Sequence, residues 1–157
     1  MQEESGSGAT TDIIKGMHLG PRECFEQCAR HKPDNHAAWY NIGTLLNTFD
    51  RTNKIGDHYY ERHECFHKAL TIDDTDAMAW FNLGVALPPG RSSGAINGIE
   101  YNPRQCFEQS ILRNARDPDV WYNLGCALDG EGDISIPLRH GKQFTRQQCF
   151  ELTLRMN

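Results

Sequence analysis

The sequence predicts an all-α fold built from repeated pairs of antiparallel helices, and three observations support this prediction. One pattern occurs three times: AWYNIG at residues 38–43, AWFNLG at 79–84 and VWYNLG at 120–125. Its tryptophans, Trp39, Trp80 and Trp121, are 41 residues apart. A second pattern centred on Cys-Phe occurs four times on nearly the same spacing, at residues 22–26, 63–67, 104–108 and 147–151. Self-similarity at such a period is typical of a solenoid whose units stack on their neighbours.

The helices can be placed in order along the chain. Pro21 at a first helical position predicts a helix over residues 22–32, and residues 33–35 (PDN) end it and supply caps for the next helix. In that next helix Ala38, Trp39 and Ile42 recur at helical spacing. The later units repeat this plan. A capping box at residues 145–148 (TRQQ) predicts a last helix that stops at Asn157.

Three insertions, near residues 48–60, 88–101 and 129–144, separate the two helices of each unit. Each contains an X-Gly step flanked by apolar residues, which favours a short extended ribbon or a tight turn. Asn97-Gly98 is the strongest of these signals. The predicted organisation is a flexible lead-in over residues 1–19 and one domain over residues 20–157, with one leading helix and three extended helix pairs.

Composition narrows the classes of function. The chain has 157 residues and a net charge of −5, which argues against a nucleic-acid or anionic-membrane surface, because either would need clustered Lys and Arg. No apolar run approaches membrane-spanning length, and residues 1–8 lack the pattern of a secretory signal. We therefore expect a cytoplasmic protein with no nucleic-acid partner and no membrane partner.

The cysteines predict reduced thiols rather than a disulfide framework. Four of the six, Cys24, Cys65, Cys106 and Cys149, occupy one equivalent position in successive units. Neighbouring helices lie roughly 10 Å apart, which is too far for a disulfide. We expect reduced, half-buried thiols that act as small hydrophobic side chains. Cys28 occupies a position that needs only a small side chain, so its spacing from Cys24 indicates packing.

At this point the patterns resemble a known family, the tetratricopeptide repeat. The resemblance rests on Trp with Gly four residues later, on Phe66 with the small Ala69 three later, and on Pro33 closing the turn, and it covers roughly residues 20–157. It implies a right-handed superhelix of antiparallel helix pairs. Two departures are visible. The unit has 41 residues rather than about 34, and a small residue expected early in the second helix is replaced by Pro21, Arg62, Pro103 and Arg146. Such extended units with Cys-Phe blocks are similar to those of kinetoplastid parasite proteins.

The resemblance also implies a binding site. In that family the first helices line a concave groove, and an asparagine there bonds the backbone of an extended peptide. The matching positions are Asn41, Asn82 and Asn123, with Tyr40, Phe81 and Tyr122 beside them as apolar contacts. An alternative remains open, in which the asparagine is a common residue of the repeat and the aromatic side chains pack between units. The clamp residues that hold chaperone tails are missing, so that ligand class is disfavoured.

One short segment matches the sequence pattern of a catalytic motif. Residues 63–67 (HECFH) match H-E-x-x-H, a zinc-hydrolase pattern. In the repeat, however, His63 and His67 stand at variable polar positions beside core Cys and Phe residues, and no third ligand is indicated. Residues 129–133 (DGEGD) suggest a calcium loop but lack its required Gly and Glu. We predict no metal, no cofactor and no enzymatic activity, with a zinc-dependent hydrolase through His63, Glu64 and His67 as a minor alternative.

Two functions remain in view. The first is a non-enzymatic scaffold that binds a protein or peptide partner in the groove. The second is a structural or self-assembling solenoid segment of a larger protein, because the chain opens and closes on an unpaired helix of the second type. That arrangement favours end-to-end self-association or missing flanking sequence.

Overall fold

The described part of the computed structural model comprises residues 13–14, 17–128, 134–135 and 141–156. It is all-α, as predicted, apart from short strand pairs. The helices within these residues are α1 (Pro21–His31), α2 (His36–Leu45), α3 (Arg62–Ile72), α4 (Ala77–Ala86), α5 (Pro103–Arg113), α6 (Pro118–Cys126) and α7 (Arg146–Met156). The strands are β1 (Ile13–Ile14), β2 (Met17–His18), β3 (Ile134–Ser135) and β4 (Gln143–Phe144). None of the described helices combines the length and the apolar character needed to cross a bilayer.

The helix boundaries follow from local capping. The side chain of Asn35 accepts a hydrogen bond from the Ala38 amide at 3.0 Å and so caps α2. Asn102 and Gln105 form a reciprocal capping box at the start of α5, and the predicted box between Thr145 and Gln148 is present before α7. The odd-numbered helices are α1, α3, α5 and α7. They begin at the four positions where the tetratricopeptide pattern would have a small residue and this chain does not, namely Pro21, Arg62, Pro103 and Arg146.

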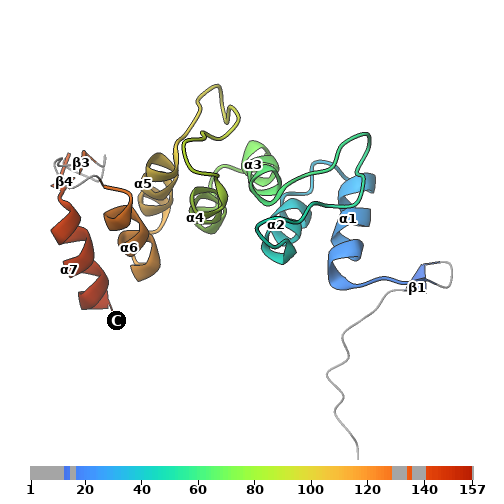
Figure 1. The fold of residues 1–157 in the computed structure, drawn as a ribbon, viewed down its shortest axis with the longest axis horizontal. Coiled ribbons are helices and arrows are strands. Elements are labelled where there is room, and N and C mark those ends of the chain that lie inside the picture. Colours follow the sequence, from blue (N-terminus) through green and yellow to red (C-terminus); the bar gives the residue numbers. More distant parts are fainter. Residues whose placement is uncertain (1–12, 15–16, 129–133, 136–140, 157) are drawn as a thin grey trace, which may run out of the picture.

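The helices alternate between two layers. In Figure 1 the even-numbered helices α2, α4 and α6 lie below α3 and α5, and the loops after α2 and α4 project upward. Short turns lead from each odd helix to the next even helix. Long connections, which we name loop 1 (residues 46–61), loop 2 (87–102) and loop 3 (127–145), lead from each even helix to the next odd helix. Each even helix packs on the odd helices before and after it, most extensively on the one that follows.

Three apolar clusters form the core, one for each repeated unit. Each contains one tryptophan, Trp39, Trp80 or Trp121, and all three are buried. Each indole Nε1 donates a hydrogen bond of 2.8 Å to a backbone carbonyl six residues earlier, those of Pro33, Asp74 and Ala115. The tryptophans therefore join the turn before each even helix to the apolar core.

The repeated glycines allow a close contact between helices. Gly43, Gly84 and Gly125 face the rings of Phe66, Phe107 and Phe150, and a Cβ at each glycine would lie 2.8, 2.6 and 2.7 Å from a ring carbon. An alanine side chain would not fit at these distances without movement. Each ring therefore lies directly against the preceding even helix.

Loops 1 and 2 are ordered by the same pattern of hydrogen bonds. At the base of loop 1 the backbone amide of Thr52 donates to the Tyr60 carbonyl at 2.9 Å. At the base of loop 2 the backbone amide of Ser93 donates to the Tyr101 carbonyl at 2.7 Å. At the tip of loop 2 Ile96 and Ile99 exchange two backbone hydrogen bonds around Asn97 and Gly98, whose φ angles are 51° and 81°. The predicted tight turn at Asn97-Gly98 is thus confirmed.

The other predicted turns can be compared only in part. Ile55 and His58 form the corresponding bridge in loop 1. In loop 3 the strands β3 and β4 pair antiparallel, with Ile134 opposite Phe144, whereas most of the predicted turn between them lies outside the described residues. Within the predicted lead-in, β1 and β2 also pair antiparallel.

Loops 1 and 2 contribute to the core rather than only connecting helices. Ile55 and Ile96 are buried in the clusters of their units. The aromatic residue that ends each loop packs on the tryptophan of its unit, with ring centroids 4.8 Å apart for Tyr60, 4.7 Å for Tyr101 and 5.0 Å for Phe144.

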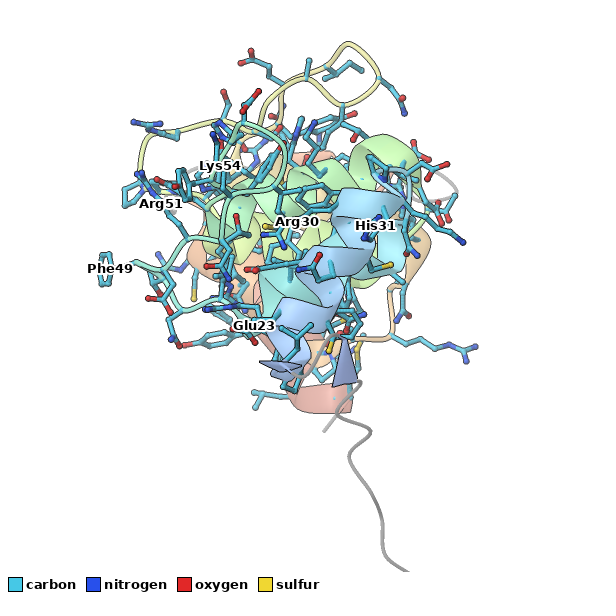
Figure 2. The ribbon with its side chains drawn as sticks, turned by 90° about the vertical axis from the view of Figure 1, so that its right-hand side faces the viewer. Glu23, Arg30, His31, Phe49, Arg51 and Lys54 are labelled. Carbon is cyan, nitrogen blue, oxygen red and sulfur yellow. The ribbon has the colours of Figure 1, made fainter. Side chains whose placement is uncertain are left out.

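Loop 1 is also fixed to α1. Glu26 on α1 is fully buried, and Arg30 donates two hydrogen bonds to the Lys54 carbonyl, at 3.0 and 2.8 Å. Figure 2 shows Arg30 on α1 beside the loop that carries Lys54. The position equivalent to His67 is therefore polar and variable, as the sequence indicates, but in the first unit loop 1 covers it.

Candidate functional site

The three predicted asparagines lie at equivalent positions on the even helices, one on each, and all are partly buried. The amide of Asn41 donates to the Ala37 carbonyl at 2.7 Å, and that of Asn123 donates to the Asp119 carbonyl at 2.8 Å. Both bonds lie within the asparagine's own helix. Asn82 differs, because its amide donates to the Tyr40 hydroxyl of the preceding unit at 3.3 Å.

These bonds leave part of each amide available. Each side chain uses one N–H, while the Oδ1 atoms of the three residues accept no hydrogen bond from the described part of the chain. An asparagine amide has two donor hydrogens and a carbonyl with two lone pairs. Each side chain can therefore still offer one donor and one acceptor to a peptide group.

The predicted aromatic residues pack between units. Tyr40, Phe81 and Tyr122 contact the phenylalanine of the next odd helix, with ring centroids 5.9 Å apart for Phe66, 6.0 Å for Phe107 and 5.7 Å for Phe150. Tyr40 and Phe81 are partly buried, whereas Tyr122 is exposed. These contacts favour the packing alternative for Tyr40 and Phe81, while Tyr122 keeps a surface on which a ligand can lie.

Two further apolar residues, missed in the sequence, extend the surface around Asn82. Met78 and Val85 are exposed and lie on α4 four residues before and three residues after Asn82, so they share its helical face. The same spacing can be read from the sequence once α4 is assigned.

A polar contact links the first two units near this surface. His36 Nε2 on α2 lies 3.2 Å from the carboxylate of Asp76, the residue that caps α4. His36 also stacks on Tyr40, with ring centroids 6.3 Å apart. Burial raises the pKa of the Tyr40 hydroxyl, and the negative charge of Asp76 raises it further. The hydroxyl therefore stays protonated at neutral pH and can serve as acceptor for Asn82.

The H-E-x-x-H residues make local contacts. Glu64 accepts a hydrogen bond from the Glu61 amide at 2.8 Å in the capping box of α3. His63 lies 3.7 Å from the Glu61 carboxylate, and His67 contacts the Ala95 carbonyl of loop 2 at 3.2 Å. Within the residues that the structure describes, no three His, Cys, Asp or Glu side chains are arranged to hold a metal ion. The calcium-like segment at 129–133 lies outside that part of the chain.

All six cysteines are free thiols, but their burial differs from the expectation. Cys65, Cys106 and Cys149 are fully buried rather than half-buried, whereas Cys24 and Cys28 are partly buried. Burial raises the pKa of Cys65 far above its ordinary value, and raises those of Cys106 and Cys149 to about 12 and about 11. Cys126 is exposed on α6.

A depression of about 210 Å³ lies between the start of loop 1 and Glu61 at its end, and none of the six predicted site residues lines it. Its lining includes Phe49, whose side chain is almost fully exposed and points away from the body of the protein in Figure 2.

A comparison with models of protein families finds no match to this chain, and a comparison with curated protein sequences finds none either.

Proposed function

We propose that this protein is a non-enzymatic protein-interaction module of the tetratricopeptide type. In this proposal the helix pairs form a right-handed superhelix, and an extended segment of a partner protein binds along the even helices. Neither a metal nor a cofactor takes part. The six free thiols fit a reducing compartment, so we place the interaction in the cytoplasm.

The observation that carries this proposal is the recurrence of one half-satisfied amide. Asn41, Asn82 and Asn123 occupy the same position in three successive units, and each keeps an unused carbonyl oxygen among the described residues. None of these oxygens is among the buried side-chain atoms of the described residues that lack a partner, so each is open to solvent, and a ligand amide can reach it. A row of equal donors and acceptors matches the repeated amides of an extended peptide whatever its side chains.

The neighbouring side chains would select among peptides. Met78, Val85 and Tyr122 are exposed on the same helices and offer apolar surface beside Asn82 and Asn123. Apolar and aromatic side chains at the centre of an interface supply much of its binding energy. We therefore expect the bound segment to be extended and to carry apolar side chains where it crosses α4 and α6.

The proposal is tested by selecting ligands from a displayed library of random twelve-residue peptides and measuring the affinity of the best ones. Asn82→Ala and Asn123→Ala should each weaken binding about fivefold, because each removes one hydrogen bond worth roughly 1 kcal/mol. Thr71→Ala is the matched control, since Thr71 is polar and exposed on α3 in the other layer. Peptides whose affinity is indifferent to both asparagine changes would remove the proposed groove.

A further inference from the structure

The two layers of helices differ in charge. Each odd helix contains two residues that are Lys or Arg, whereas α2, α4 and α6 contain neither and contain no Glu. Asp119 on α6 is the only acidic residue of these three even helices, and His36 on α2, which faces Asp76, is their only histidine. The even helices are therefore almost uncharged, with a single carboxylate at the α6 end of the row.

Two further side chains accompany the asparagine of each even helix. They stand four residues before it and three residues after it, so that all three share one helical face. These flanking pairs are exposed, and they are Ala37 and Thr44 on α2, Met78 and Val85 on α4, and Asp119 and Cys126 on α6. Because α2, α4 and α6 each pack between two odd helices, this exposure is a property of the position in the repeat.

The flanking pairs offer a ligand three different surfaces. The side chains on α2 are short, those on α4 are apolar, and the pair on α6 combines a carboxylate with a thiol. Asp119 uses its backbone in the hydrogen bonds that link it to Asp117 and Asn123: its amide donates to the Asp117 side chain at 3.0 Å, and its carbonyl accepts from the Asn123 side chain at 2.8 Å. The exposed carboxylate is left available to a cation.

We propose that the even helices select an extended segment that carries an apolar side chain over α4 and a lysine or arginine over α6, where its charged group pairs with Asp119. This inference rests on the proposed peptide binding and adds the chemistry of the selected peptide. The stem of Lys or Arg is apolar, so it also fits beside Cys126 and the apolar surface expected over α6. Since the asparagines repeat while their neighbours differ, the two side chains fix which way a given segment runs.

Asp119 also has a structural role, which predicts a different result. It lies in the first turn of α6, where a carboxylate favours the partial positive charge of the helix N-terminus. That role changes the stability of α6 but not the charge of the preferred peptide. The net charge of −5 attracts any cationic peptide, but it does so whichever acidic residue contributes the charge. A charge preference tied to position 119 therefore distinguishes the proposed contact from both effects.

The test uses the full chain and the best peptide selected from a displayed library of random twelve-residue peptides. We expect that peptide to carry Lys or Arg two to five positions from an apolar residue, and to lose affinity at least fivefold when its basic residue is replaced by Glu. By fluorescence polarisation, Asp119→Asn should weaken the original peptide roughly two- to fivefold, as expected for an exposed ion pair. Asp119→Lys should reverse the preference, so that the Glu-containing peptide binds more tightly than the original.

A matched control isolates the position of the charge. Asp57→Asn makes the same change in net charge, and the Asp57 side chain is fully exposed in loop 1. This variant should leave the affinity within about 1.5-fold, because exposed charges more than roughly 8 Å apart are largely screened at physiological salt. Circular dichroism of Asp119→Lys checks that α6 remains folded, and Asp119→Asn provides the milder second variant.

The apolar contact over α4 has its own matched pair of variants. Met78 on α4 is 40% exposed and Ile72 on α3, in the other layer, is 39% exposed. Met78→Ser should weaken the selected peptide at least threefold, whereas Ile72→Ser should leave its affinity unchanged. Equal losses in the two variants would contradict the apolar contact.

The outcomes separate this inference from the proposed function. A peptide that depends on Asn82 and Asn123 but binds equally well to the Asp119→Lys variant would keep the interaction module and overturn the proposed selectivity. Selected peptides without a basic residue would overturn it too. A library that gives no binding peptide at all would count against both proposals.

Discussion

Glu26 on α1 accepts two hydrogen bonds from Asn53 in loop 1, one from the backbone amide at 3.0 Å and one from the side-chain amide at 2.7 Å. The two residues are 27 positions apart, and Glu26 is fully buried. This contact fixes loop 1 over the first helix.

Glu26→Ala should destabilise the protein, because it removes both hydrogen bonds that hold loop 1 to α1 and leaves a cavity where the buried carboxylate was. A hydrogen bond to a charged group contributes about 1.5–3 kcal/mol, so the urea midpoint should fall clearly. Glu151→Ala is the matched control: Glu151 occupies the equivalent position on α7 and is exposed. A loss of stability equal in the two variants would contradict the assigned role of Glu26.

Loop 2 offers a comparison between two isoleucines of one hairpin. Ile96 is 0% exposed, whereas its partner Ile99 is 55% exposed. Ile96→Ala should lower the free energy of unfolding by about 2–5 kcal/mol through a cavity in the core, and Ile99→Ala should change it by less than about 0.5 kcal/mol. Urea denaturation followed by tryptophan fluorescence measures both. Equal effects would show that loop 2 is not part of the core.

Gly84→Ala should destabilise the protein even though alanine favours a helix by about 1 kcal/mol over glycine. The new Cβ would lie 2.6 Å from the Phe107 ring, and overpacking of this kind typically costs about 1–3 kcal/mol. The double variant Gly84→Ala, Phe107→Leu should show a favourable coupling in a double-mutant cycle. Additive effects would mean that the ring does not meet the new methyl group. Thr44→Ala on the exposed face of α2 serves as the control.

The exposed cysteine and the three buried ones should react at different rates. Cys126 is exposed, whereas Cys65, Cys106 and Cys149 are buried and have raised pKa values, so their thiols stay protonated at pH 8. A chromogenic disulfide reagent should therefore label Cys126 rapidly, and should reach the buried three only after denaturation. Cys126→Ser should remove the fast phase. Rapid labelling of Cys106 in the native protein, located by mass spectrometry, would contradict this burial.

Stability should decrease as the pH rises through about 9. Burial raises the pKa of Cys106 to about 12, whereas in the unfolded chain the thiol ionises near its ordinary value of 9.0. The unfolded state therefore loses protons that the folded state keeps, and each such group favours unfolding by at most about 1.4 kcal/mol per pH unit. Urea titrations between pH 8 and 10 under reducing conditions measure the slope. Cys106→Ala should make the slope shallower, and an unchanged slope would sink this account.

Much of the fold can be predicted from the sequence because the chain repeats its own signals. The 41-residue period and the caps at Asn35, Asn102 and Thr145 together indicate the helices and their order. The turn at Asn97-Gly98 follows from the conformational preference of that dipeptide. These signals are local, so no tertiary contact is needed to interpret them.

The docking of the loops could not be predicted in the same way. A comparison between units shows only what their residues share, and the loop-facing position of the odd helices differs between them: it holds Glu26, His67, Glu108 and Glu151. The loop residue that meets this position differs too. Asn53 bonds Glu26, whereas the equivalent Gly94 leaves room for the His67 ring, because a Cβ at Gly94 would lie 2.9 Å from it. A search for paired changes between the chain's own units would have found this relationship.

For the candidate site, the sequence predicts the positions of the residues but not their contacts. The positions of Asn41, Asn82 and Asn123 on the even helices follow from the repeat. The bond from Asn82 to the Tyr40 hydroxyl depends on the approach of two helices, and so does the packing of Phe81 on Phe107. Such contacts depend on side-chain detail that a sequence pattern does not specify.

Extensive packing joins only consecutive helices in the described part of the chain, and this restricts how such a molecule can change in evolution. A whole unit of 41 residues carries one even and one odd helix, and the same kind of even-odd interface recurs along the chain. Gene duplication or deletion of one unit would therefore leave interfaces of this same kind between the remaining helices. The length of the molecule is therefore free to vary in whole units, whereas a gain or loss of a few residues inside a helix would misalign a tryptophan with its turn.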